Sequence, residues 1–87
     1  HDTQDMVEKI IGEGENVLSS RLEVKYLNEK YGLGLEENEE YDTLAGYIIY
    51  HQNGIPSAGS DIIIGDKEIR ILRSTSSKLE LVKVKIL

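Results

Sequence analysis

The chain has 87 residues, with 16 acidic and 10 basic side chains and a net charge of −6. That charge argues against a nucleic-acid binder, which needs a basic face, and against docking on anionic lipid. With no cysteine, disulfides and thiolate metal sites are excluded. No apolar run approaches the roughly 20 residues that span a bilayer, and no signal-peptide pattern opens the chain. We therefore expect one small soluble domain, residues 1–87, cut from a longer protein.

The first part of the chain has the pattern of a β-hairpin. Residues 1–5 are polar, and we expect them to fray or to be a cloning remnant. Met6–Ile11 alternates as a strand does, Gly12–Asn16 has a turn composition, and Val17–Ser19 reads as a short return strand.

A helix is predicted to follow, starting at Ser20. Glu23 lies three residues further on, which is the spacing of a capping box. Leu22, Tyr26 and Leu27 share one face, and Gly32 is expected to end the helix.

The stretch Tyr41–Pro56 has no formally charged side chain between Thr43 and Asn53. A helix that is apolar over most of its circumference is predicted to be buried on more than one side. Asp42 or Thr43 can serve as the N-cap, and Gly54 as the residue just beyond the end. Gly46 costs about 1 kcal/mol of helix propensity relative to Ala, so we expect another backbone to approach it closely.

The last third of the chain is predicted to be β-structure. Asp61–Ile64 and Glu68–Arg73 flank a Gly-Asp turn, and Leu79–Leu87 alternates apolar and polar side chains. The order ββ-α-α-βββ favours an α+β fold, a small antiparallel sheet with two helices packed on one face. If the terminal strand is an edge strand, its free N–H and C=O groups can pair with another chain.

Two places in the sequence offer candidate chemistry. The loop from Gly34 to Asp42 carries the clustered carboxylates that hard cations bind, namely Glu36, Glu37, Glu39, Glu40 and Asp42. Their spacing matches no EF-hand loop, so a solvated loop whose last carboxylates favour the next helix N-terminus is the preferred interpretation. His51 is a candidate general base, but the sequence supplies no nucleophile motif, and a hydrogen-bonded histidine near a helix end is favoured. We therefore assign no catalytic, cofactor or metal residue.

The order of these segments resembles the transporter-associated domain, also called the CorC/HlyC domain. The similarity covers about Ile10 to Ile86. It is carried by SSRLEVKYLNEKYGLGL, by EENEEYDTLAGYIIYHQNGIP, and by GSDIIIGDKEIRILRSTSSKLELVKVKI. The YDTLAGYI, GIP and following Gly are the specific part. The sequence departs from the family at Ser20, where Gly is frequent, and at Asn53, near which a basic residue is frequent.

The resemblance implies a fold like one half of a flavin-binding oxidoreductase domain, without the flavin site. It also implies a place at the C-terminal end of haemolysin-like, magnesium/cobalt efflux-related membrane proteins, after a transmembrane region and a pair of CBS domains, on the cytoplasmic side. The family has no defined catalytic residues and no cofactor.

Three functions were compared. The first is a non-enzymatic accessory domain that modulates ion transport. It docks against the membrane-embedded and CBS domains of its own protein, or against a second copy as a homodimer. It binds no nucleic acid and does not itself insert into the membrane. The second is a divalent-cation sensor that binds Mg²⁺ or Co²⁺ through the acidic loop. The third, a hydrolase using His51, lacks a second catalytic partner. The first is preferred.

Overall fold

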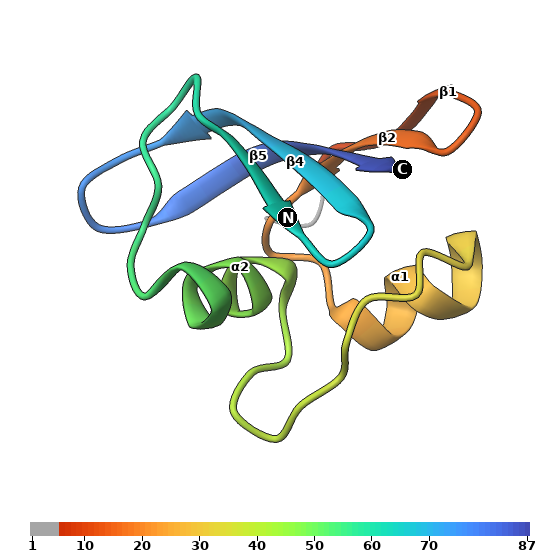
Figure 1. Cartoon of the computed structure of the whole chain (residues 1–87), viewed down its shortest axis with the longest axis horizontal. Helices are drawn as coiled ribbons and strands as arrows, with labels where there is room; N and C mark the ends of the chain where they lie inside the picture. The colour runs from red at the N-terminus through yellow and green to blue at the C-terminus, as the bar shows by residue number, and fades with distance from the viewer. Residues whose placement is uncertain (1–5) are drawn as a thin grey trace.

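A computed structural model describes residues 6–87; residues 1–5, expected to fray, lie outside that range. The elements follow the predicted order (Figure 1). They are β1 (Glu8–Gly12), β2 (Glu15–Ser19), α1 (Val24–Tyr31), α2 (Leu44–Gln52), β3 (Asp61–Ile64), β4 (Lys67–Ser74) and β5 (Leu79–Ile86). The two helices lie on the same side of the sheet, which confirms the predicted α+β arrangement.

The five strands form one antiparallel sheet in the order β1-β2-β5-β4-β3. The last strand of the chain is therefore the central one, paired with β2 on one side and β4 on the other. The idea that this strand is an edge is wrong, and the edges belong to β1 and β3. The two hairpins leave a position between β2 and β4, and β5 fills it because both neighbours present alternating apolar side chains to the same layer.

The core lies between the sheet and the two helices. Leu18 of β2, Val82 and Val84 of β5, and Ile69 and Ile71 of β4 point toward the helices and are fully buried or nearly so. The helices contribute Leu27, Leu44 and Ile48, each with no exposed surface. The opposite face of the sheet is open and mixes charged and apolar side chains. Arg70 of β4 pairs with Asp61 of β3 at 2.7 Å, and Leu72 and Ile63 of the same two strands are exposed.

The capping box predicted at Ser20 is wrong. The first helix begins at Val24, and its N-cap Glu23 makes no side-chain cap hydrogen bond. Ser20 is instead fully buried, and its hydroxyl donates to the Leu79 carbonyl at the start of β5. A short polar side chain here satisfies a buried strand carbonyl rather than a helix end.

The second helix matches the sequence prediction closely. The Thr43 hydroxyl accepts from the Gly46 N–H at 3.1 Å, so Thr43 is the N-cap. At the other end Asn53, with φ 61°, takes the left-handed position that was expected of Gly54. Burial is less complete than predicted, because Tyr50 is 49% exposed while Leu44, Tyr47 and Ile48 are buried.

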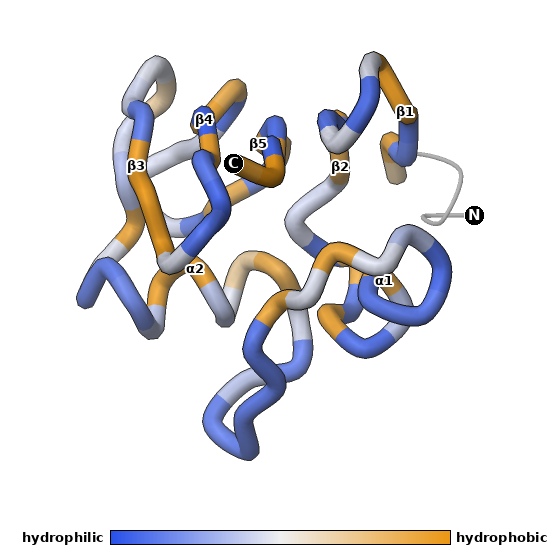
Figure 2. The backbone as a smooth tube through the Cα atoms, turned by 45° about the vertical axis from the view of Figure 1, so that its right-hand side comes forward, coloured by the Kyte–Doolittle hydropathy of each residue, from blue (hydrophilic) through white to orange (hydrophobic). Residues whose placement is uncertain are grey.

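The acidic loop hangs below the two helices, away from the sheet (Figures 1 and 2). Leu33 and Leu35 are buried and anchor the start of the loop in the core. The Asn28 side chain of α1 holds the loop in place: it donates to the Leu35 carbonyl and accepts from the Leu35 N–H, both at 2.8 Å. The hydrophilic part of the loop lies beyond these anchors.

A polar cluster joins the edge strand β1 to α1. One carboxylate oxygen of Glu8 accepts from the hydroxyls of Tyr26 at 2.6 Å and Tyr31 at 2.7 Å, and from the Lys30 ammonium at 2.7 Å. Hydrogen bonds from Lys30, then Tyr26 and Tyr31, lower the pKa of Glu8 to about 2. The Glu8 carboxylate thus connects the outermost strand to the helix layer.

Candidate functional site

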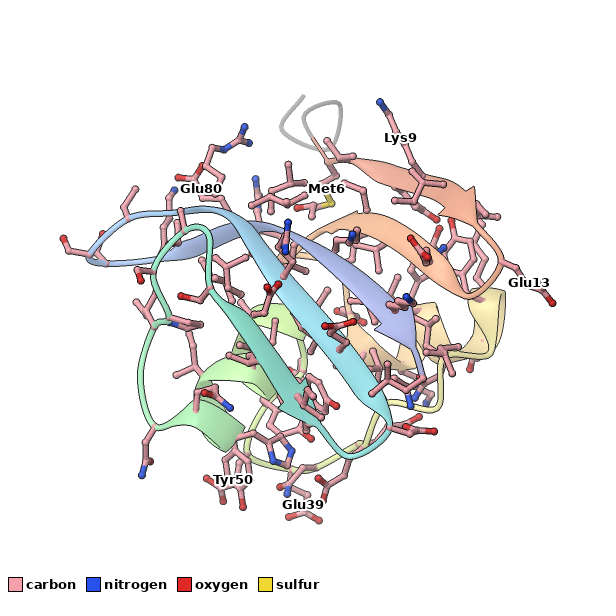
Figure 3. The ribbon with its side chains drawn as sticks, turned by 45° about the horizontal axis from the view of Figure 1, so that its top comes forward. Met6, Lys9, Glu13, Glu39, Tyr50 and Glu80 are labelled. Atoms are coloured by element: carbon pink, nitrogen blue, oxygen red, sulfur yellow. The ribbon has the colours of Figure 1, made fainter. Side chains whose placement is uncertain are left out.

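The acidic loop does not bring its carboxylates together. The Glu36 Oε1 lies 2.9 Å from the His51 Nε2, and Glu37 accepts from Asn28 at 3.3 Å. Figure 3 places Glu39 and Tyr50 at the same end of the molecule. Across residues 6–87, no group of three or more acidic or histidine side chains stands ready to hold a metal ion.

His51 lies at the surface and contacts aromatic rings and one carboxylate. Its ring centroid lies 5.0 Å from that of Tyr47 and 5.4 Å from that of Tyr50, both edge-on. Burial raises the pKa of Tyr47 to about 12, so this phenol stays protonated at physiological pH. The contacts of His51 are those of a histidine that stabilises the loop against α2, as the sequence favoured.

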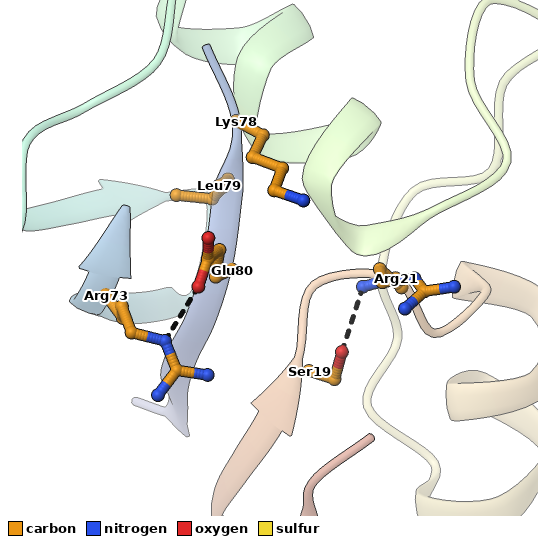
Figure 4. A pocket seen from close by; sticks show the side chains of 6 residues that line it. All are labelled: Ser19, Arg21, Arg73, Lys78, Leu79 and Glu80. Carbon is orange, nitrogen blue, oxygen red and sulfur yellow. Dashed lines mark hydrogen bonds and ion pairs between the residues drawn. The ribbon is translucent and has the colours of Figure 1, made fainter. Parts of the chain in front are cut away.

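A second surface, which the sequence analysis did not identify, surrounds Arg21. We name it the Arg21 groove and define it as three adjoining concavities that Arg21 borders in common. The first, of 180 Å³, lies among the end of β2, the end of β4 and the start of β5 (Figure 4), with Ser19, Arg73, Lys78 and Glu80 in its wall.

The other two concavities are larger and more apolar. One, of 460 Å³, is bordered by Ala45 and Ile49 of α2 and shares Lys78 and Leu79 with the first. The other, of 340 Å³, is bordered by Leu22 and Tyr26 and shares Met6 with the second. Figure 3 shows Met6 and Glu80 toward the same side of the molecule, at the top of the view.

The groove residues come from distant parts of the sequence. Arg21 follows β2, whereas Arg73 lies near the end of β4 and Lys78 precedes β5. Only the pairing of β5 with both neighbours brings them together. No local sequence signal identifies such a set. The one sequence clue is the Arg-Leu pair at Arg21-Leu22, which lies in the segment SSRLEVKYLNEKYGLGL that carries the family resemblance.

No helix in the described range 6–87 is long and apolar enough to cross a membrane. The fold and its surfaces define a class of protein: a small α+β domain in which the polar side chains Glu8, Asn28 and His51 hold its segments together.

The family model described as "Transporter associated domain", CorC_HlyC, matches residues 9–87. The chain therefore belongs to the CorC/HlyC transporter-associated domain family, which the sequence motifs had indicated. Members of this family are transporter-associated accessory domains and are not known as catalysts.

A curated relative from Rickettsia canadensis (strain McKiel), described as a possible hemolysin C, is 30% identical over 79 residues. The match covers 90% of this chain but 26% of the relative, so the chain spans about a quarter of the relative's length.

Solved structures share the fold. The Mg²⁺ and Co²⁺ transporter (CorC) associated region from Neisseria meningitidis MC58 superposes with a TM-score of 0.82 at 19% identity, covering 92% of this chain and 98% of that one. A CorC_HlyC domain of a Xylella fastidiosa Temecula1 hemolysin, in complex with Mg²⁺ and Mn²⁺, gives 0.74 at 21% identity, covering 93% and 98%. The transporter-associated domain of a CBS domain protein from Porphyromonas gingivalis gives 0.77 at 15% identity, covering 92% and 97%.

Proposed function

We propose that this domain is a non-catalytic regulatory part of a haemolysin-like, CBS-containing membrane protein, where it modulates the transport of divalent cations such as Mg²⁺ or Co²⁺. It acts from the cytoplasmic side by docking against the membrane-embedded and CBS domains of its own protein. The observation that carries this proposal is the family match over residues 9–87, together with the transporter and CBS descriptions of its structural relatives.

Docking regulates only if the domain contacts one conformation of the transporter more favourably than another, because a binding partner shifts an equilibrium by its differential affinity. A rigid module with exposed charged surfaces suits that role. The chain offers the open face of the sheet and the acidic loop as surfaces for such contacts, and the paired side chains Asp61 and Arg70 lie on the open face.

The experiment is to delete the domain from the longer protein and measure Mg²⁺ and Co²⁺ efflux from loaded cells. We expect a changed rate or a changed dependence on cation concentration. The control is the full-length protein carrying Ser76→Ala, an exposed turn position, at matched abundance in the membrane. Efflux identical to that of the intact protein would refute the proposal.

A second candidate function, divalent-cation sensing by the acidic loop, is favoured by the Mg²⁺ and Mn²⁺ complex of the Xylella relative. In this chain, Glu36 is engaged by His51 and Glu37 by Asn28. Cation binding would therefore have to release existing contacts, which weakens the site.

Titration of Mg²⁺, Mn²⁺ or Co²⁺ into the isolated chain, followed by backbone NMR, tests this candidate. Saturable shifts over residues 36–42 that disappear in Glu39→Gln/Glu40→Gln would support it, with Glu13→Gln in the β1–β2 turn as the control. The absence of a saturable shift at millimolar metal would eliminate it.

A further inference from the structure

We propose that the Arg21 groove binds an extended peptide segment that carries a carboxylate next to an aliphatic side chain. The segment belongs to another part of the longer protein. This inference rests on the proposed function and adds the Arg21 groove to the surfaces through which the domain docks.

Positive charge is concentrated at the groove in a chain that is otherwise acidic. Arg21, Lys78 and Arg73 all border its first concavity, although the whole chain has a net charge of −6. Arg73 is already neutralised by Glu80, with 2.7 Å between Nε and Oε1. No acidic side chain within residues 6–87 forms an ion pair with Arg21 or Lys78, and both cations border the first concavity.

The apolar wall lies beside these cations. Ala45, Ile49 and Leu79 border the 460 Å³ concavity, which Arg21 and Lys78 also border. Leu79 is almost fully buried, whereas Ala45 and Ile49 on the outer side of α2 are partly exposed. A ligand that places an anionic group between the cations thus has an apolar surface for its neighbouring side chain.

Three backbone hydrogen bonds hold the segment that carries Arg21. Ser20 donates its N–H to the Glu80 carbonyl at 2.9 Å, and its own carbonyl accepts from Ala45 N–H at 2.8 Å. The Leu22 carbonyl accepts from Leu44 N–H at 2.9 Å. The connector between β2 and α1 is therefore fixed to both β5 and α2. Ligand binding then costs little conformational entropy, because the backbone of the groove is already ordered.

A peptide fits this surface better than a membrane does. A flat anionic lipid surface would meet the acidic side chains that surround the groove, Glu23 and Glu80 among them, as well as the two cations. A peptide inserts a single carboxylate into the concavity and leaves those acidic groups in solvent. Sequence outside this chain is available as its source, because the match covers only 26% of the Rickettsia relative.

The test is an NMR titration of the 87-residue chain with an eight-residue capped peptide in which glutamate and leucine alternate. Three further probes are a glutamine–leucine peptide, inorganic phosphate, and phosphatidylglycerol vesicles. We expect saturable shifts at Arg21, Lys78 and Ile49 with the first peptide, and several-fold weaker binding of the other probes.

Variants locate the site. Arg21→Gln and Lys78→Gln should each weaken binding of the acidic peptide by about three- to fivefold, the effect of losing one exposed ion pair. The matched control is Lys85→Gln, which removes the same charge from the other end of β5, about 20 Å away along the strand. Its affinity should change by less than about twofold.

Several results would overturn the inference. These are shifts that avoid the groove, equal binding of the glutamine peptide or of phosphate, binding to vesicles alone, or equal weakening by Lys85→Gln. The outcome is independent of the efflux experiment. Peptide binding without an effect of domain deletion on efflux would refute the proposed function and support the groove as a peptide site. An effect of deletion without peptide binding would support the proposed function and refute the groove.

Discussion

Gly46 of α2 lies so close to Tyr41 that a Cβ atom at position 46 would stand 2.6 Å from the Tyr41 Cβ. Tyr41 cannot move away easily, because its hydroxyl donates to the Glu36 carbonyl at 2.6 Å and its ring packs on Tyr47, with centroids 5.8 Å apart. Gly46 therefore has a close neighbour as expected, but the nearest atom is the Tyr41 Cβ, whereas the Tyr41 backbone Cα would stand 3.6 Å from the added Cβ. This contact fastens the end of the acidic loop to the helix.

Gly46→Ala should destabilise the domain although alanine is the better helix former. The gain in helix propensity is about 1 kcal/mol. The overlap with Tyr41 costs more, since overpacking a rigid site costs about 1 to 3 kcal/mol. Urea unfolding should show a net loss of up to about 2 kcal/mol, whereas Gln52→Ala, on the exposed side of the same helix, should stay near the parent value. A more stable Gly46→Ala would show that the contact relaxes freely.

Ser20→Ala should remove a buried hydrogen bond that ties the β2–α1 connector to β5. The hydroxyl is fully buried and donates to the Leu79 carbonyl, so its loss should cost about 1 to 2 kcal/mol of unfolding free energy. Ser76→Ala removes an exposed hydroxyl and is the matched control. Equal melting temperatures for the two variants would contradict this role of Ser20.

Two substitutions at Asn28 should have different effects on the acidic loop. Asn28→Ala removes both contacts with Leu35, whereas Asn28→Asp keeps the acceptor for the Leu35 N–H and loses the donor to its carbonyl. Hydrogen exchange at the Leu35 amide should therefore accelerate strongly in Asn28→Ala and much less in Asn28→Asp. Glu29→Gln, on the exposed side of α1, should leave it unchanged. Equal acceleration in both variants would argue against the hydrogen bond from the Leu35 N–H to the Asn28 side chain.

Glu8 should make stability depend on acidic pH. Its pKa is about 2 in the folded protein against an ordinary value near 4.5. Because the folded pKa is depressed, the stabilising contribution is complete above about pH 4.5 and is lost as the pH falls toward 2. Glu8→Gln should cost about 1 kcal/mol at pH 7, and the difference from the parent should shrink below pH 4.5. Glu13→Gln, an exposed turn position, serves as the control, and a pH-independent difference would contradict the role of the Glu8 carboxylate.

Local patterns were enough to predict most elements of the fold. Thr43 caps a run of uncharged residues, and the Gly65-Asp66 turn separates two apolar runs, so α2 and the β3–β4 hairpin were placed nearly as observed. The start of α1 was misplaced because Ser20 and Glu23 have the spacing of a capping box. A long-range bond from Ser20 to Leu79 overrides that local preference, and nothing in the neighbouring residues announces it.

The candidate surfaces were harder to predict. The acidic loop was evident from composition, but the pairing of Glu36 with His51 depends on how the loop folds back on α2. The Arg21 groove depends on the central place of β5, and the sequence alone left the position of that strand open. Buried Lys67, which contacts Asp66, was likewise missed because it follows directly on a turn.

The central place of β5 has a consequence for biosynthesis. β5 joins the two hairpins and is the last of the five strands to be synthesised. It includes Leu79, whose carbonyl accepts the hydrogen bond from the Ser20 hydroxyl. Until β5 is synthesised, β2 and β4 each have an unpaired side, and unpaired strand edges are prone to associate with other chains.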